Sequence, residues 1–343
     1  MIGTTDIMNN NRRFLLTARP DGTPQASDFS LVDEAVPAIG PDEILIRNHY
    51  ASLDPAIRGW LDDVPSYLPP VELGDAVRAT TVGIVEASNA EGFAPGDWVM
   101  GLNKIEHYSV AKLGGFTSRI DADIVPSVTN YLSVMGAVGL TAWFGVTEIL
   151  KPKAGETFLI SGAAGAVGSM AGQLGKLAGA RVVGIAGGPA KCKRLIVDYG
   201  FDAAIDYRGK DVEALTQAIG EACPKGIDLV FENVGGIGLD ATLTHINPYA
   251  RIGLCGLISE YNGEAYGTRN LWQLIARMAT IRGFLISEFL DRFAEGGMAM
   301  AKLVAEGKLR FDEHIDEGID NAYPAFLRLF EGSNQGKMIL KMA

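Results

Sequence analysis

The sequence predicts an α/β protein in which a doubly wound parallel sheet is inserted into a β-domain built from both ends of the chain. Apolar runs alternate with amphipathic helical segments from about residue 131 to 308, a pattern typical of a parallel sheet. Short β-like runs separated by turn residues precede and follow this stretch. The length of 343 residues fits two domains, which we place at residues 1–130 plus 309–343 and at residues 131–308.

The β-domain is expected to be antiparallel and barrel-like. Three runs before residue 130 predict its strands: residues 43–47, 80–85 and 98–100. After about residue 308 the chain returns to short β-like pieces and ends in a run at 336–340. Because such pieces flank the parallel-sheet region on both sides, the simplest arrangement is one discontinuous domain.

The parallel sheet is expected to have six short, buried strands. They are residues 157–161, 181–186, 203–206, 227–231, 251–255 and 281–286. Helical segments fit between them. One apolar helix face is expected to combine six residues at helical spacing: Val167, Met170, Ala171, Leu174, Leu177 and Ala178.

Composition excludes several classes of protein. The net charge of −11 argues against a nucleic-acid-binding surface. No uninterrupted apolar run reaches the roughly 18 residues that a membrane helix needs, and the polar stretch Met1–Arg13 does not resemble a signal peptide. Only three cysteines are present, which argues against a disulfide framework. We therefore expect a cytoplasmic protein without nucleic-acid or membrane partners.

The strongest local motif is the small-residue run at 161–168 (SGAAGAVG), which follows an expected strand and opens an expected helix. Small residues let the backbone approach a pyrophosphate, whose charge is favoured at a helix N-terminus. The spacing is G-x-x-G-x-x-G, with Ala164 at the offset of the usual middle glycine. Tight packing of a strand against a helix also demands small residues, but in this context we favour a dinucleotide site.

The residues after the second strand favour NADP(H) over NAD(H). An NAD-binding protein usually places an acid there to accept hydrogen bonds from the ribose, whereas residues 186–194 (AGGPAKCKR) contain no carboxylate. Lys191 is the candidate contact for a 2′-phosphate. Lys193 and Arg194 are expected on a solvated helix face. Tyr207 either lines the adenosine end or is an ordinary half-buried tyrosine.

A catalytic zinc site is not expected, because the chain lacks a suitable ligand set. The first 190 residues contain no cysteine, and their only histidines are His49 and His107. The later cysteines are Cys192, Cys223 and Cys255. Of these, Cys255 ends an expected strand and is interpreted as a core or cofactor-wall residue rather than a nucleophile. We therefore expect no metal.

Four separate motifs resemble the leukotriene B4 dehydrogenase/prostaglandin reductase family. They are residues 52–60 (SLDPAIRGW), 231–236 (FENVGG), 256–262 (GLISEYN) and 332–337 (GSNQGK). This family belongs to the zinc-independent medium-chain dehydrogenase/reductase superfamily and includes plant alkenal double-bond reductases and bacterial curcumin reductases. The resemblance spans nearly the whole chain. It implies a Rossmann domain inserted in a GroES-like β-barrel-type domain.

The resemblance also implies which residues contact NADP(H). Along the chain they are Gly165, Ala166, Val167, Gly168, Lys191, Tyr207, Asn233, Cys255, Gly256, Leu257, Ile258, Ser259, Tyr261, Phe284, Leu285, Ile286 and Asn334. Mammalian members have Tyr-Met at the positions of Ala56 and Ile57. The sequence differs from them there, and bacterial members of the family differ in the same way. A second tyrosine of the mammalian enzymes, expected before Gly283, has no clear counterpart. An eicosanoid is therefore not the expected substrate.

The implied activity is NADPH-dependent reduction of the C=C bond of an α,β-unsaturated aldehyde or ketone, with hydride delivered to the β-carbon and no zinc. Tyr261 is the candidate donor to the developing enolate oxygen, or it only packs on the nicotinamide. Tyr50 and Asp54 are candidates for the substrate side, although Asp54 with Pro55 equally suits a turn. The alternatives are an NADPH-dependent quinone reductase and an NADPH-binding protein without turnover. Family members are often homodimers, and we expect one here.

Overall fold

The computed structural model describes residues 10–342, and the chain divides into two compact units. Unit 1 comprises residues up to 132 together with 314–334 and 338–343, and unit 2 comprises 133–313 and 335–337. The N-terminal stretch up to residue 9, part of the polar segment discussed above, lies outside the described residues. In the described part of the chain, no helix is long and apolar enough to cross a membrane.

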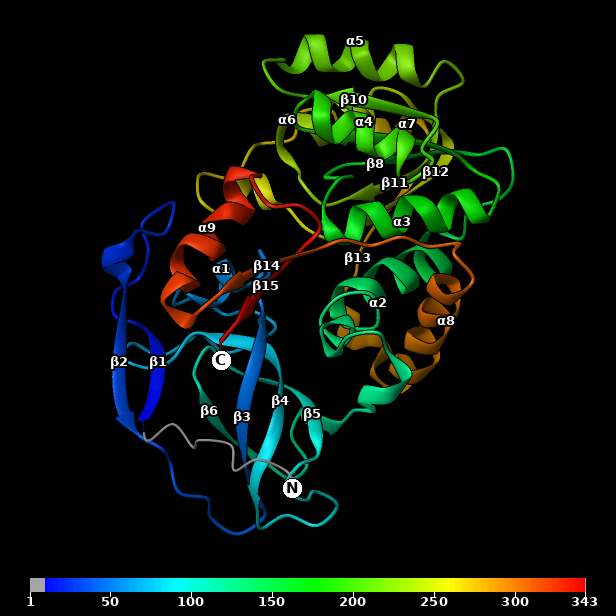
Figure 1. The fold of residues 1–343 in the computed structure, drawn as a ribbon. Helices are drawn as coiled ribbons and strands as arrows, with labels where there is room; N and C mark the ends of the chain where they lie inside the picture. The colour runs from blue at the N-terminus through cyan, green and yellow to red at the C-terminus, as the bar shows by residue number, and fades with distance from the viewer. Residues whose placement is uncertain (1–9, 343) are drawn as a thin grey trace. The chain divides into compact units, whose positions relative to one another are not determined.

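Unit 2 contains the predicted parallel sheet of six strands (Figure 1). The strands are β8 (Thr157–Ile160), β9 (Arg181–Ala186), β10 (Ala203–Asp206), β11 (Ile227–Glu232), β12 (Ile246–Leu254) and β13 (Thr280–Gly283). Their order is β10-β9-β8-β11-β12-β13, and each neighbouring pair of strands is parallel. This is the doubly wound order, in which the winding direction reverses between β8 and β11. The predicted fold class is confirmed.

The helices of unit 2 precede or follow the strands along the chain and cover the sheet (Figure 1). The α-helices are α2 (Ala137–Phe144), α3 (Ala166–Leu177), α4 (Pro189–Val197), α5 (Val212–Ala222), α6 (Gly236–Leu243), α7 (Trp272–Ala276) and α8 (Phe293–Ala305). Shorter turns are η4 (Gly145–Leu150), η5 (Ile258–Glu260) and η6 (Ile286–Arg292). Because η6 begins at Ile286, the last predicted strand was too long: β13 ends at Gly283.

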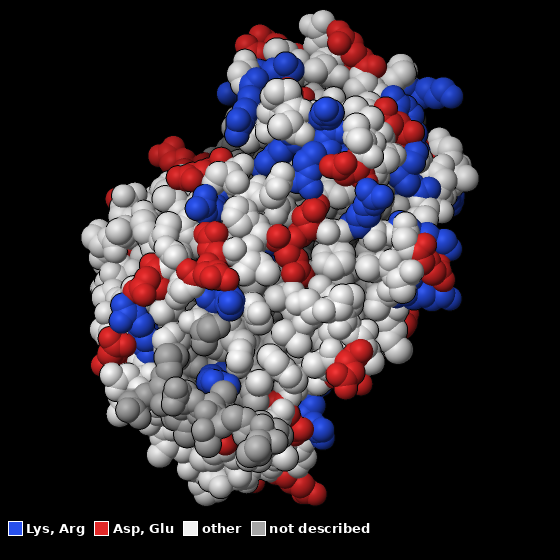
Figure 2. All heavy atoms as spheres, in the orientation of Figure 1, with Lys and Arg blue, Asp and Glu red and all other residues white. Residues whose placement is uncertain are grey.

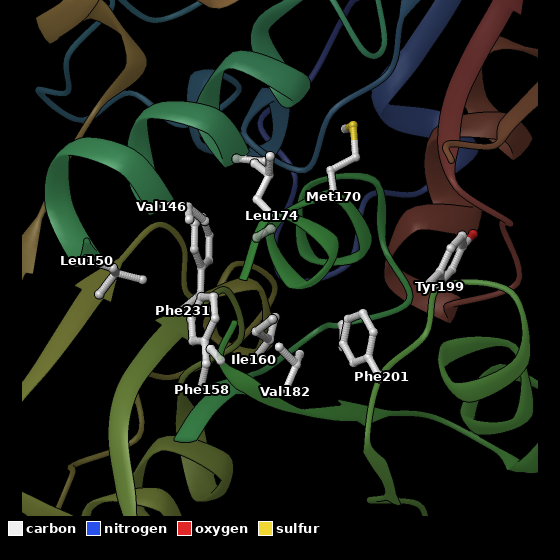
Figure 3. Close-up of a cluster of buried hydrophobic side chains, with 14 of the residues drawn as sticks. Val146, Leu150, Phe158, Ile160, Met170, Leu174, Val182, Tyr199, Phe201 and Phe231 are labelled. Carbon is white, nitrogen blue, oxygen red and sulfur yellow. The ribbon is translucent and has the colours of Figure 1, made fainter. Parts of the chain in front are cut away.

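The core of unit 2 lies between the sheet and the helices that precede and follow β8. Phe158, Ile160 and Phe231 are fully buried there, and Leu174 of α3 packs in the same cluster. Figure 3 shows these side chains pointing toward one another. A contiguous apolar cluster of this kind fixes β8 and α3, and therefore also fixes the loop that joins them.

The predicted apolar face of α3 is correct in the middle of the helix and wrong at its end. Met170, Ala171 and Leu174 are buried, but Leu177 and Ala178 are exposed. The helix ends at Leu177, and the chain turns through Gly179 into β9, so the last two positions project beyond the packed face. The short distance to the next strand overrides the periodic pattern here.

Unit 1 contains the predicted β-rich domain. Its strands are β1 (Asn10–Leu16), β2 (Phe29–Ala35), β3 (Glu43–Ser52), β4 (Arg78–Ser88), β5 (Trp98–Lys104), β6 (Tyr108–Lys112), β7 (Ser118–Arg119), β14 (Glu313–Glu317) and β15 (Lys337–Lys341). Strands β3, β4, β5, β7, β14 and β15 form one sheet, with β6 paired to β3, and β1 pairs with β2. The pairs β3–β4, β4–β5 and β15–β3 are antiparallel, so segments from both ends of the chain share one sheet.

Helical elements also occur in unit 1: α1 (Ile57–Trp60), α9 (Ala322–Glu331), η1 (Ala26–Asp28), η2 (Ala122–Ile124), η3 (Val128–Tyr131) and η7 (Ile319–Asn321). The expectation of only short β-like pieces after residue 308 was wrong at α9. Ala322, Ala325 and Phe326 are its buried residues, at helical spacing, and Gly332 ends the helix in the left-handed conformation. These signals were present in the sequence.

Two short segments that the sequence assigned to the β-domain, residues 309–313 and 335–337, group with unit 2. Asp312 accepts hydrogen bonds from Lys337 N at 2.8 Å and from the Arg194 guanidinium at 2.6 Å. Gly336 forms a parallel bridge with Gly165. These bonds tie both segments to unit 2.

The half-buried His49 of β3 should make the stability of the fold depend on pH. Burial lowers its pKa to about 4, aided by the positive charge of Arg47, and its Nε2 has no hydrogen-bond partner among the described residues. The unfolded chain therefore binds this proton first, and the free energy of unfolding should fall as pH drops from about 6.5 to about 4, by at most about 3 kcal/mol. Urea unfolding at a series of pH values measures the slope.

The control for this prediction is His49→Gln, which removes the titrating group. Its unfolding free energy should fall less steeply across the same pH range than that of the unsubstituted protein. His107, whose pKa burial also lowers, stays in place and accounts for part of the remaining slope. Identical slopes in the two proteins would show that His49 does not titrate as proposed.

Candidate cofactor-binding site

The loop between β8 and α3 is held close to the sheet by backbone contacts. Ser161 N donates to Phe231 O at 3.1 Å, and Ala163 N donates to Ile185 O at 3.0 Å. Gly162 has φ of +57°, a left-handed conformation that favours glycine. A Cβ at Gly168 would lie 2.5 Å from Gly162 O, so position 168 of α3 leaves no space for a side chain. The glycines therefore serve loop geometry and close packing together.

The N-terminus of α3 has the character of an anion site. Gly165 is its N-cap, and Ala166, Val167 and Gly168 form the first turn. The N–H groups of a first helical turn have no acceptor within the helix and carry partial positive charge. No acidic residue lies in this turn to compete for them. The arrangement suits a pyrophosphate.

Asn233 supports this loop from the neighbouring strand. Its backbone N donates to Ser161 Oγ at 2.8 Å, and its side-chain Nδ2 donates to Ser161 O at 2.7 Å. Ser161 Oγ donates in turn to Glu232 Oε1 at 2.5 Å. The Asn233 amide therefore fixes the start of the phosphate loop. Its predicted direct contact with the cofactor remains a prediction.

A second group of positive charges lies after β9, at the start of α4. Burial lowers the pKa of Lys191, and the positive charges of Arg208 and Arg194 lower it further. A phosphate group bound among these cations would relieve their mutual repulsion, so the cluster suits an anion. Figure 2 shows Lys and Arg side chains gathered on the part of the surface where Figure 1 places α3 and α4.

Arg208 was missed by the sequence analysis, although it follows the predicted Tyr207 directly. A Cβ built on Gly187 would lie 3.1 Å from the Tyr207 hydroxyl and 3.2 Å from Arg208 Nε, so both side chains cover the glycine turn. The register Asp206↔Ala186 between β10 and β9 brings these residues together. Tyr207 is half exposed.

An acid, Asp206, does lie near this turn. It is not in the stretch 186–194, where an NAD-binding protein would usually place one. Its Oδ1 accepts from Gly188 N at 2.8 Å and from Arg208 N at 3.0 Å. These backbone hydrogen bonds lower the pKa of Asp206. Because that oxygen already serves the turn, Asp206 shapes the site through the backbone.

The side chain of Arg194 was expected to lie on a solvated helix face but is bonded to other residues instead. Its guanidinium donates to Asp312 at 2.6 Å and to the Tyr199 hydroxyl at 3.0 Å, and it pairs with Asp198. Tyr199 also donates to Asp312, and burial raises the pKa of the tyrosine. Arg194 therefore anchors α4 to the segment around Asp312. Lys193 is exposed, as expected.

The segment after β12 contains the residues predicted to line the nicotinamide: Cys255, Gly256, Leu257, Ile258, Ser259 and Tyr261. Cys255 N and Gly256 N both donate to Glu232 O, so this segment begins beside the end of β11. The Tyr261 hydroxyl accepts from Leu257 N at 3.3 Å. Burial raises the pKa of Tyr261, which keeps the phenol protonated. A neutral hydroxyl that accepts from the backbone retains its proton for donation elsewhere.

The remaining predicted cofactor residues lie in different surroundings. Phe284 is 6% exposed and packs edge-to-face on Phe231 in the core. Leu285 is exposed, and Ile286 opens η6. Asn334 lies in the loop between α9 and β15, two residues before Gly336. Their contacts with the cofactor remain predictions.

The two candidates for the substrate side belong to unit 1. Tyr50 lies on β3, paired with Val82 and Lys341 on either side. Asp54 accepts from Ser52 Oγ at 2.5 Å, and its carbonyl accepts from Ile57 N at 3.0 Å in the turn that opens α1. The turn-forming role of Asp54 is thus visible in the structure, while a substrate contact remains a prediction for both residues.

Comparison with known proteins agrees with this geometry. Residues 12–118 match the family model described as the N-terminal domain of oxidoreductase, and residues 166–302 match that described as zinc-binding dehydrogenase. The NADPH-dependent curcumin reductase of Escherichia coli is 38% identical over 97% of each chain. The NADP-dependent 2-alkenal reductase of Nicotiana tabacum is 33% identical over 97% of this chain and 98% of that one. The crystal structure of CurA from Vibrio vulnificus with NADPH has a TM-score of 0.90 and 38% identity, covering 97% and 99% of the two chains.

The fold and the phosphate loop define a dinucleotide-binding oxidoreductase. The chain belongs to the medium-chain dehydrogenase/reductase family that includes curcumin reductase and 2-alkenal reductase. It is an NADP(H)-dependent enzyme. The residues present fit this cofactor, since a glycine loop, an acid-free helix N-terminus and the two cations Lys191 and Arg208 lie in one unit.

Proposed function

We propose that this enzyme reduces the C=C bond of α,β-unsaturated aldehydes or ketones. The observation that supports this best is the similarity, across 97% of the chain, to enzymes named for curcumin and 2-alkenals, both of which contain a conjugated enone or enal. The first turn of α3 would hold the pyrophosphate, and Lys191 with Arg208 would hold the 2′-phosphate. When bound, NADPH supplies the hydride that reaches the β-carbon.

The protein side of the proposed reaction is stabilisation of the developing enolate. Tyr261 would donate a hydrogen bond from its hydroxyl to the carbonyl oxygen of the substrate, where negative charge accumulates, and a proton from solvent would then reach the α-carbon. A donor aimed at that oxygen accelerates the reaction because its hydrogen bond strengthens in the transition state. The raised pKa of Tyr261 ensures that the proton is present at neutral pH.

A side-by-side assay of NADPH oxidation tests the proposed substrate class. With trans-2-nonenal or another enone, the rate should exceed that with a simple quinone at equal concentration. A preference for the quinone would favour the alternative activity, quinone reduction. A saturated aldehyde serves as the control for carbonyl reduction and should give no oxidation above background.

We propose further that the reaction needs no metal. Among the described residues, no group of three or more His, Cys, Asp or Glu side chains is arranged to hold a metal ion. Activity should therefore survive prolonged dialysis against a strong chelator with its rate unchanged. Restoration of lost activity by added zinc, together with stoichiometric zinc in elemental analysis, would contradict the proposal.

We also propose a homodimer formed along β13. Within the described residues this strand is the last of its sheet, so one edge offers unpaired backbone groups that a second copy can pair with antiparallel. Three large apolar side chains beside it are exposed, Trp272 by 60%, Ile275 by 83% and Met278 by 56%.

Sedimentation should show a dimer, and Ile275→Glu should weaken it. Met298→Glu, at a site on α8 that is exposed by 65%, is the control. A monomeric unsubstituted protein would contradict the proposal.

A further inference from the structure

The carboxyl group of Glu232 is the most completely buried acid of the cofactor-binding unit, with 0% exposure at the end of β11. Its Oε1 accepts three hydrogen bonds, from Ser161 Oγ at 2.5 Å, Val234 N at 2.7 Å and Gly235 N at 2.8 Å. Its Oε2 is equally buried but has no hydrogen-bond partner among the described residues. The two oxygens of one carboxyl group thus have opposite environments.

This asymmetry matches a neutral acid better than a carboxylate. A carboxylate shares its charge between both oxygens, and burying one of them without a donor is costly. In a carboxylic acid, the carbonyl oxygen accepts the hydrogen bonds, and the hydroxyl on Oε2 lacks an acceptor, which costs less than burying an ionised oxygen without a donor. Burial raises the pKa of Glu232 against the effect of its donors.

The surroundings contain no compensating charge. Among the described residues, no Lys or Arg pairs with Glu232, and the groups on the neighbouring elements are the Ser161 hydroxyl after β8, the backbone of residues 233–235 and Cys255 after β12. Burial raises the pKa of the Cys255 thiol to about 12, so this neighbour is neutral as well. Nothing on the described chain would stabilise an ionised Glu232 through Oε2.

We propose that Glu232 is a protonated positioning residue of the cofactor site. Its Oε1 accepts hydrogen bonds from Ser161, at the start of the phosphate loop, and from the turn at 234–235. The proton on Oε2 keeps the side chain of Glu232 uncharged. The phosphate loop begins at Ser161, so a negative charge at Glu232 would act against a pyrophosphate bound there. The inference concerns NADP(H) binding and is independent of which enone is reduced.

Two variants separate charge from hydrogen bonding. Glu232→Gln keeps an accepting oxygen and is neutral, so the KM for NADPH should stay within about twofold of the unsubstituted enzyme. Glu232→Ala leaves three donors without an acceptor, so that KM should rise about tenfold or more, with a smaller change in kcat. Asp228→Asn is the matched control: Asp228 accepts from Thr157 N at 2.8 Å, at the opposite end of the same strand pair, and its substitution should leave the KM unchanged.

Infrared spectroscopy of the cofactor-free protein gives a readout that does not depend on activity. At neutral pH the unsubstituted protein should show the carbonyl band of a buried carboxylic acid, and Glu232→Gln should lack it. Absence of that band, or a Glu232→Gln variant that loses NADPH affinity as severely as Glu232→Ala or does not fold, would overturn the proposal. Failure of the enone assay alone would leave it standing.

Discussion

Replacing both Lys191 and Arg208 by alanine should raise the KM for NADPH by about a hundredfold or more and leave the KM for NADH nearly unchanged. Each cation can contribute one charge-assisted hydrogen bond to the 2′-phosphate, worth about 1.5–3 kcal/mol, and each 1.4 kcal/mol corresponds to about tenfold in affinity. NADH lacks this phosphate. Steady-state kinetics with both cofactors measures the ratio.

The single variants and a control on the same helix sharpen this test. Lys191→Ala and Arg208→Ala should each lose part of the preference for NADPH. Lys193→Ala should lose none, because Lys193 is exposed on α4 and has no place in the proposed site. Equal losses for NADPH and NADH would show that the cations only support the fold, and a loss confined to Lys191→Ala would remove Arg208 from the phosphate site.

The substitution Tyr261→Phe should lower kcat by about a hundredfold, the typical effect of removing one donor to a developing oxyanion. The ring and its packing remain, so NADPH affinity should change little. Only the hydroxyl is lost, together with its bond to Leu257 N. Rates measured with NADPH carrying deuterium at the transferred position show whether hydride transfer limits kcat.

Tyr266→Phe is the matched control on the same loop. The Tyr266 hydroxyl donates to Asp240 at 3.2 Å, and Tyr266 lies outside the segment 255–261 that is predicted to line the cofactor. Its loss should leave kcat near the original value. If kcat of Tyr261→Phe is unchanged while hydride transfer limits the rate, Tyr261 only packs against the cofactor.

Much of the fold could be predicted because buried parallel strands are short apolar runs bounded by turns. The second and third strands of the sheet were predicted with the bounds of β9 and β10. Helix α9 was missed because it lies between two short β-like segments, although Ala322, Ala325 and Phe326 have helical spacing. The end of α3 was misjudged at Leu177, because periodicity alone cannot show where the chain turns away from the core.

The site was predictable where one segment contains the whole signal and not where strands bring distant segments together. The loop at 161–168 and Lys191 were identified from local sequence. Arg208 and Asp206 were missed, because only the pairing of β10 beside β9 brings them to the turn at Gly188. The role of Glu232 was missed for a similar reason. Its partner Ser161 follows the neighbouring strand β8 and is 71 residues away in sequence.

The position of a transferred deuterium tests the central claim most directly. The enzyme would be incubated with an enal and with NADPH deuterated at the hydride position, and the product analysed by NMR. The account predicts a saturated aldehyde with deuterium on the former β-carbon and a solvent-derived proton on the α-carbon. An unsaturated alcohol with deuterium on the carbonyl carbon would contradict it.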